Sequence, residues 1–173
     1  LPYAATGLDW LFDTEREKSA GILNGIDADV WNPTSDKMIA KNYSVRTVEA
    51  GKKANKAALC KQFNLDPNKP LVAFIGRLVY QKGADIMAGI FDRALEANDI
   101  NGLVLGSGDP HAEFLLNKLK GKYPGRYNTF IGYDEELSHL IYAGADFLIM
   151  PSRFEPCGLN QLYALRYGTI PVV

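Results

Sequence analysis

The sequence predicts an α/β domain of the Rossmann-like, doubly wound type, in which helices cover both faces of a parallel β-sheet. From residue 70 onward, short apolar runs alternate with longer segments whose apolar residues recur at helical spacing. This alternation indicates right-handed βαβ crossovers, which make the strands parallel. A hydrophobic content of 47% in 173 residues is enough for one domain with a substantial core.

The apolar runs predict five strands, and the segments between them predict four helices. Leu71–Ile75 is short and apolar enough for a strand that is buried on both faces. A helix over 84–97 follows, because its apolar residues form one stripe. The remaining strands are expected at 102–105, 127–131, 145–150 and 170–173, and the remaining helices at 111–120, 134–143 and 157–167.

The first seventy residues differ from the rest of the chain. The stretch "NGIDADVWNPTSD" is dense in Gly, Asn, Asp and Pro, which favour turns, and one helix is expected near 54–63. We therefore expect an entry segment over 1–69 and a Rossmann-like domain over 70–173 that is truncated at its C-terminus. The first residue is Leu and the last residues read as a strand, which indicates a piece of a larger protein.

Charge and cysteine content argue against several classes of protein. Lysine and arginine number 19 against 20 acidic residues, so no nucleic acid or membrane partner is expected. The apolar runs are too short for a membrane span and the N-terminus lacks a signal-peptide pattern, so we expect a cytosolic protein. Cys60 and Cys157 lack metal-site spacing and are expected to be reduced thiols, with no metal site.

Four loops should meet where this sheet binds ligands, because ligands of open parallel α/β sheets lie beyond the carboxyl ends of the strands. In the first loop, Arg77 and Lys82 are five residues apart. Two cations at this edge suit a diphosphate, although they could also be solvated loop residues. The four loops are expected at 76–83, 106–110, 132–135 and 152–161.

The second and third loops carry weaker signals. "GSGDP" lacks the third glycine of the dinucleotide fingerprint Gly-x-Gly-x-x-Gly and follows the second strand instead of the first. Gly106 and Gly108 therefore indicate either a tight turn or a backbone that approaches a ligand closely. Tyr133 could stack on a nucleobase, or it could be an ordinary surface tyrosine.

The fourth loop, "SRFEPCGLNQ", places a carboxylate and a thiol before a helix. A helix start at this edge favours phosphate, and Gly158 removes a side chain beside its free N–H groups. Because a carboxylate repels phosphate, Glu155 is expected to hold sugar hydroxyls or a cationic partner, with a helix cap as the alternative. Cys157 would need a base to act as a nucleophile, and nothing places His111 or His139 beside it.

Together these loops resemble the bacterial glycogen synthase and plant starch synthase family. The resemblance rests on "GILNGIDADVWNP", "GRLVYQKG", "GSGDP" and the stretch from "GYDEELSHL" to "GTIPVV", in this order over nearly the whole chain. Members are retaining glucosyltransferases that extend an α-1,4-glucan from a nucleoside-diphosphate glucose, here ADP-glucose, with two Rossmann-like domains facing a cleft in the GT-B arrangement. The resemblance implies that this chain is most of the C-terminal nucleotide-binding domain, preceded by a segment from the interdomain region.

The resemblance also implies a role for each motif residue. Arg77 and Lys82 would hold the diphosphate and stabilise the leaving nucleotide, and Tyr133 would stack on the base. Glu155 would contact the donor glucose. No cofactor or metal is implied beyond the donor. The other nucleotide-sugar-binding residues would be Asn24, Gly106, Gly108, Cys157, Gly158 and Leu159.

Two departures from the pattern limit what the resemblance implies. Tyr163 occupies the position eight residues after Glu155, where retaining enzymes often carry a second glutamate, so a two-glutamate scheme does not transfer. The N-terminal domain and its Lys-x-Gly-Gly-Leu loop are absent, so we expect the isolated chain to make no glucan. Another retaining GT-B enzyme such as a sucrose-type synthase, a nicotinamide-dependent dehydrogenase and a binding-only module are the alternatives. For a plant protein, the expected location would be the plastid.

Overall fold

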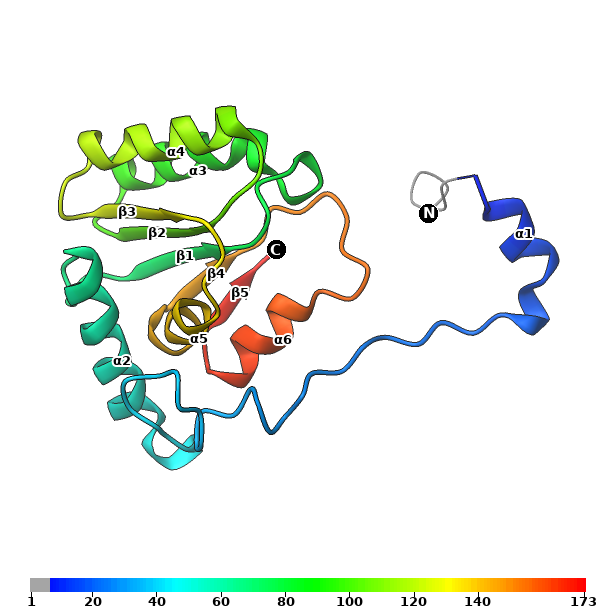
Figure 1. The fold of residues 1–173 in the computed structure, drawn as a ribbon, viewed down its shortest axis with the longest axis horizontal. Helices are drawn as coiled ribbons and strands as arrows, with labels where there is room; N and C mark the ends of the chain where they lie inside the picture. Colours follow the sequence, from blue (N-terminus) through cyan, green and yellow to red (C-terminus); the bar gives the residue numbers. More distant parts are fainter. Residues whose placement is uncertain (1–6) are drawn as a thin grey trace.

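In the computed structural model, which describes residues 7–173, a parallel five-stranded sheet forms the centre of the molecule (Figure 1). Its strand order is β3-β2-β1-β4-β5. All neighbouring strands run parallel, so the Rossmann-like, doubly wound fold predicted from the sequence is confirmed. The strands are β1 (Leu71–Ile75), β2 (Asn101–Gly106), β3 (Tyr127–Ile131), β4 (Phe147–Ile149) and β5 (Ile170–Val172).

Helices cover both faces of the sheet, and each face has its own buried core. One face carries α3 (Ala84–Ala97) and α4 (Pro110–Lys122). The other face carries α2 (Val48–Phe63), α5 (Glu135–Gly144) and α6 (Leu159–Arg166). Because β2 lies between these layers, every one of its residues is buried, as expected for a strand without a solvent-facing side.

The order of the strands reverses beside β1. From β1 the chain builds outward through β2 to β3, and it then returns to place β4 on the other side of β1. The loops after β1 and β4 therefore leave neighbouring strands at the carboxyl edge of the sheet. In open α/β sheets, the ligand crevice lies at this kind of reversal.

The helix expected near 54–63 is longer than predicted, because α2 begins at Val48. Its start is hidden in the sequence by β-branched residues and by Gly51, which do not favour helix. The glycine is required by packing, since a Cβ at Gly51 would come within 2.2 Å of the Cβ of Tyr43. A capping box between Ser44 and Thr47 begins the short 3-10 turn η3 (Val45–Thr47) that leads into α2.

The helix predicted over 157–167 begins later, at Leu159. Gly158 is its N-cap and has the left-handed φ of 67°, so Cys157 stays in the preceding loop. A second short 3-10 turn, η4 (Tyr80–Lys82), lies in the loop after β1. The other predicted elements agree with the structure to within a few residues at each end.

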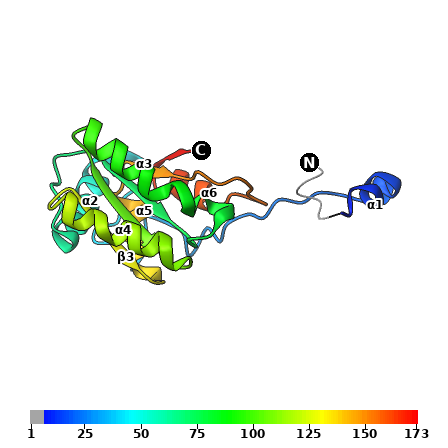
Figure 2. The same cartoon turned by 90° about the horizontal axis from the view of Figure 1, so that it is seen from above.

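The part of the chain before Trp31 extends away from the α/β domain (Figure 2). It contains α1 (Asp9–Thr14) and the 3-10 turn η2 (Arg16–Lys18), neither of which the sequence predicted. Trp10 is 65% exposed and α1 has no buried residue. Within residues 7–173, no helix combines the length and the apolar character that a membrane crossing requires.

Candidate functional site

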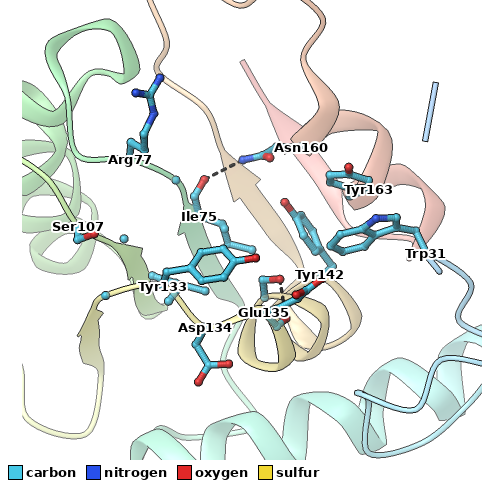
Figure 3. Close-up of a pocket in the computed structure, with 15 residues that line it drawn as sticks. Trp31, Ile75, Arg77, Ser107, Tyr133, Asp134, Glu135, Tyr142, Asn160 and Tyr163 are labelled. Carbon is cyan, nitrogen blue, oxygen red and sulfur yellow. Dashed lines mark hydrogen bonds between the residues drawn. The ribbon is translucent and has the colours of Figure 1, made fainter. Parts of the chain in front are cut away.

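A cavity of about 340 Å³ opens at the carboxyl edge of the sheet (Figure 3). The ends of β1, β2 and β3 form one side of it, and side chains from α5, α6 and the entry segment form the other. Arg77, Gly106 and Tyr133 are among the lining residues. Three of the positions predicted from separate loops therefore meet in one cavity.

Aromatic side chains dominate one half of this edge, and we call Trp31, Tyr133, Tyr142 and Tyr163 the aromatic half of the site. Trp31 lies between two parallel rings, with centroid distances of 3.8 Å to His139 and 3.9 Å to Tyr163. Tyr142 meets Trp31 edge-on at 5.6 Å. Tyr133, in the loop after β3, lines the same cavity and is 84% exposed (Figure 3). Flat apolar surfaces of this kind suit a planar ligand ring.

A buried polar network packs against Trp31 through His139. Asp36 accepts hydrogen bonds from the Tyr167 hydroxyl at 2.5 Å and from Nδ1 of His139 at 2.7 Å. Burial, together with the hydrogen bond to Asp36, raises the pKa of Tyr167 well above its ordinary value, so this hydroxyl stays a donor at neutral pH. His139 is therefore a buried structural residue next to Asp36 and Trp31.

The second half of the edge is charged, and we call Lys82 and Glu155 the charged half of the site. Lys82 Nζ lies 2.5 Å from Glu155 Oε1, and the hydroxyl of Ser152 donates to the same oxygen at 2.8 Å. Only 22% and 21% of the two charged side chains is exposed. The expectation that Glu155 has a cationic partner is confirmed. The helix-cap alternative is wrong, because α6 has no side-chain cap.

The two glycines of "GSGDP" allow the second loop to pack against the first. A Cβ at Gly106 would lie 2.1 Å from the carbonyl oxygen of Gly76, and one at Gly108 would lie 2.4 Å from that of Leu78. The N–H group of Gly108 donates to the carboxylate of Glu113 at 2.7 Å. The structure therefore favours tight packing of the two loops as the role of Gly108, because its amide is already paired.

Some of the predicted residues lie away from the cavity. Asn24 is exposed in the extended stretch before Trp31 and does not line the cavity. Gly108 does not line it either, nor do Cys157 and Gly158, which lie between Glu155 and α6, or Leu159, which is the first residue of α6. Figure 3 shows the guanidinium of Arg77 pointing away from the aromatic half. Arg77 is exposed, so its group is free to meet a ligand that extends out of the cavity.

Sequence reasoning missed several lining residues, above all Trp31 and Asn160. The side-chain amide of Asn160 donates to the carbonyl of Ile75 at 2.8 Å and so joins α6 to the end of β1 (Figure 3). One available signal was helical spacing, because Asn160 and Tyr163 lie three residues apart and share a face of α6. Trp31 is a large apolar residue within a turn-rich stretch, which is a weaker signal.

A Rossmann-like sheet with cations and aromatic rings at its carboxyl edge suits the transfer of a group carried on a nucleotide. Comparison with known proteins identifies this class. The chain belongs to the family described as "Glycosyl transferases group 1", whose model matches residues 55–173.

Within this class, the chain is similar to glycogen synthases, which confirms the resemblance seen in the sequence. It is 57% identical over its whole length to the glycogen synthase of Flavobacterium johnsoniae and covers 37% of that protein. It is 51% identical to the glycogen synthase of Cellvibrio japonicus, again over its whole length, and covers 36% of it. The chain therefore spans little more than a third of the length of these relatives.

A solved plant structure shows the same relationship. The catalytic domain of starch synthase IV from Arabidopsis thaliana, bound to ADP and acarbose, matches 99% of this chain with a TM-score of 0.90 and 38% identity. The match covers 36% of the plant chain. That the chain is one Rossmann-like unit of a two-domain glycosyltransferase stays a prediction.

Proposed function

We propose that the whole protein is a retaining glucosyltransferase that moves glucose from ADP-glucose to the non-reducing end of an α-1,4-glucan. One observation carries the proposal: the loop after β1 runs from the aromatic cavity, which Arg77 lines, to the Lys82–Glu155 pair. A nucleotide sugar has the same sequence of parts, namely a planar base, a charged diphosphate and a sugar. The glycogen synthase relatives and the ADP-bound starch synthase support this choice of donor and acceptor.

Each part of the donor has a partner at this edge. The base stacks on Tyr133, and Arg77 and Lys82 hold the two phosphates, one as a planar fork and one as a point charge. Amides around Cys157, Gly158 and Leu159, before and at the start of α6, close on the phosphate and the sugar. Asn24 belongs to the cleft, on the side where the rest of the enzyme would face this domain.

The chemical step breaks the bond between glucose C1 and the phosphate oxygen, and it forms a bond between C1 and the acceptor hydroxyl oxygen on the same face. The proton of the acceptor hydroxyl passes to the departing phosphate of ADP. Lys82 and Arg77 stabilise the negative charge that grows on this phosphate. Glu155 holds the donor glucose, so that C1 stays within reach of the acceptor hydroxyl on that face. Tyr163 occupies the place of a second glutamate and belongs to the aromatic half, so Glu155 is the one carboxylate in this scheme.

This scheme needs more protein than the chain itself provides. The glucan and a further domain of the same enzyme complete the cleft, so the isolated chain makes no glucan. No cofactor or metal takes part in the proposed steps. The bacterial relatives support a cytoplasmic location for a bacterial protein, and a plant protein would act in the plastid.

The test is the transfer of labelled glucose to glycogen by the full-length enzyme, with ADP-glucose and UDP-glucose compared as donors. We expect transfer from ADP-glucose with an α-linked product, and a loss of about a thousandfold in Glu155→Gln. Glu96→Gln, which changes an exposed glutamate of α3, is the matched control and should keep full activity. If the enzyme transferred glucose from neither ADP-glucose nor UDP-glucose, the proposal would be wrong. Glucose transfer by the isolated chain would contradict the proposal that this chain alone makes no glucan.

A further inference from the structure

Arg153 connects the loop after β4 to the region after β1. Its guanidinium donates to both carboxylate oxygens of Asp85, at 2.7 and 2.8 Å, and to the carbonyl oxygen of Tyr80 at 2.6 Å. It also lies 3.8 Å from the centre of the Tyr80 ring. This combination is specific to arginine, because the lysine ammonium is a point charge without a planar fork that can pair with both carboxylate oxygens and lie flat on a ring.

These contacts cross between the two loops that carry the charged half of the site. Tyr80 lies two residues before Lys82, and Arg153 lies two residues before Glu155. The backbone repeats the connection, because the N–H group of Arg153 donates to the carbonyl of Gln81 at 2.9 Å. The side chain of Gln81 donates in turn to the carbonyl of Phe154 at 3.1 Å.

A glycine lets the same two loops approach one another. Gly83 has the left-handed φ of 76°, and a Cβ at this position would lie 2.5 Å from the carbonyl oxygen of Pro151. No other residue fits here without moving one of the loops. The close approach and the contacts of Arg153 therefore act on the same pair of segments.

We propose that Arg153 is a positioning residue for glucosyl transfer, which clamps the two loops so that Lys82 and Glu155 keep their separation. The proposal rests on the proposed function and adds a residue to which neither the family resemblance nor the cavity assigns a role. Arg153 need not touch the donor, because it acts through the backbone of Tyr80 and through its own neighbour Glu155.

Folding stability alone does not account for this arrangement. The side chains of Arg153 and Asp85 are 36% and 43% exposed, and ion pairs that exposed contribute little to stability. The hydrogen bonds from Arg153 lower the pKa of Asp85, so the carboxylate stays charged and the pair persists at neutral pH. A misplacement of about 1 Å at a reacting centre, in contrast, can lower a rate about a hundredfold.

The test uses Arg153→Gln, Arg153→Lys and Asp85→Asn in the full-length enzyme. Asp92→Asn is the matched control, because Asp92 also lies on α3 and pairs with Lys122 at 2.7 Å with a similar exposure of 36%, but it does not contact either loop. We expect Arg153→Gln to lower kcat about 10- to 100-fold while KM for ADP-glucose changes less than about threefold. The kcat of Arg153→Lys should remain low, because lysine lacks the fork. Asp85→Asn should lower kcat about three- to tenfold, and Asp92→Asn should have the kcat of the wild type.

A second measurement separates positioning from general structure. Hydrogen exchange should become faster over 80–85 and 151–156 in Arg153→Gln, with the thermal midpoint close to that of Asp92→Asn. Wild-type kcat in both Arg153→Gln and Asp85→Asn, or unchanged exchange in these segments, would overturn the proposal. If the wild-type enzyme transfers no glucose, the proposed function fails, while the exchange experiment still decides whether Arg153 holds the loops together.

Discussion

The two halves of the candidate site are held in place by different kinds of interaction. The charged half sits in two loops that are joined at the surface by Arg153 and by the Lys82–Glu155 pair. In the aromatic half, Trp31 packs on a buried network in which the side chains of Asp36 and His139 are 2% and 0% exposed, whereas Tyr133 is 84% exposed.

This difference indicates how each half responds to a ligand and to the solvent. The Lys82–Glu155 pair is partly buried, with 22% and 21% of its side chains exposed, so both groups remain within reach of a donor that enters from the solvent. Breaking buried hydrogen bonds is costly, so Trp31 and the rings that pack against it are held in place before the ligand binds. The charged half should therefore control turnover, and the aromatic half should control affinity.

After Glu155→Gln, the largest effect is expected from Lys82→Met, which breaks the charged half. Removing the cation that faces the leaving diphosphate should lower kcat by about 100- to 1000-fold, with a much smaller change in KM for ADP-glucose. Steady-state glucose transfer by the full-length enzyme measures both constants. Lys118→Met, at an exposed lysine of α4, is the control and should have no effect. If Lys82→Met raised KM and left kcat unchanged, Lys82 would serve binding alone. The two halves of the site would then not differ in their control of turnover and affinity.

A smaller effect of the opposite kind is expected from Tyr133→Ala, which breaks the aromatic half. Loss of one stacking surface should weaken ADP binding about tenfold and leave kcat nearly unchanged. Calorimetry with ADP and with pyrophosphate gives a direct comparison, because only ADP carries a base. Phe114→Ala, at an exposed aromatic residue of α4, controls for the general loss of a ring. If Tyr133→Ala weakened the binding of ADP and the binding of pyrophosphate equally, the placement of the base at Tyr133 would be wrong.

The fold was predictable because its signals are local. Each apolar run from residue 70 onward forms a strand, and the fully buried β2 shows why such runs need no polar alternation. The errors occurred where tertiary contacts override local preference. Gly51 reads as a helix breaker but lies within α2 because Tyr43 leaves no room for a side chain. Cys157 reads as helical but stays in the loop because the helix starts after the left-handed Gly158.

The site was predictable only in part, for the same reason. Arg77, Tyr133 and Glu155 follow strands, and the carboxyl ends of parallel strands meet at one edge, so their grouping follows from the topology. The contribution of Trp31 depends on its stacking with His139 and Tyr163, more than a hundred residues further along the chain. The pairing of Arg153 with Asp85 spans 68 residues. A single sequence does not specify which distant cation and carboxylate will pair.

The smallest expected effect concerns the support of the aromatic half and depends on pH. Lys52 reaches the carbonyl of Ala145 at 2.9 Å and the hydroxyl of Thr169 at 2.7 Å, between the ends of α5 and α6. Burial lowers the pKa of Lys52 from 10.5 to about 8. Below about pH 8 the ammonium is charged in both the folded and the unfolded chain, and its burial destabilises the fold in full. Between about pH 8 and 10.5 the unfolded chain binds more protons, so the contribution of Lys52 to stability rises with pH.

The measurement compares the free energy of unfolding of the wild type and Lys52→Met, by urea denaturation of the protein at about pH 7.5 and about pH 9. Stopping at about pH 9 limits the opposing contribution of Cys60. Burial raises the pKa of the Cys60 thiol to about 11, so its contribution to the stability of the fold falls as the pH rises from 9 through 11. The difference between the two proteins should shift by about 1 kcal/mol in favour of the wild type as the pH rises. Lys53→Met, at the exposed neighbouring lysine, should follow the wild-type trend. Parallel trends in the wild type and Lys52→Met would show that this amine is not desolvated and that the aromatic half lacks the pH-dependent support assigned to it.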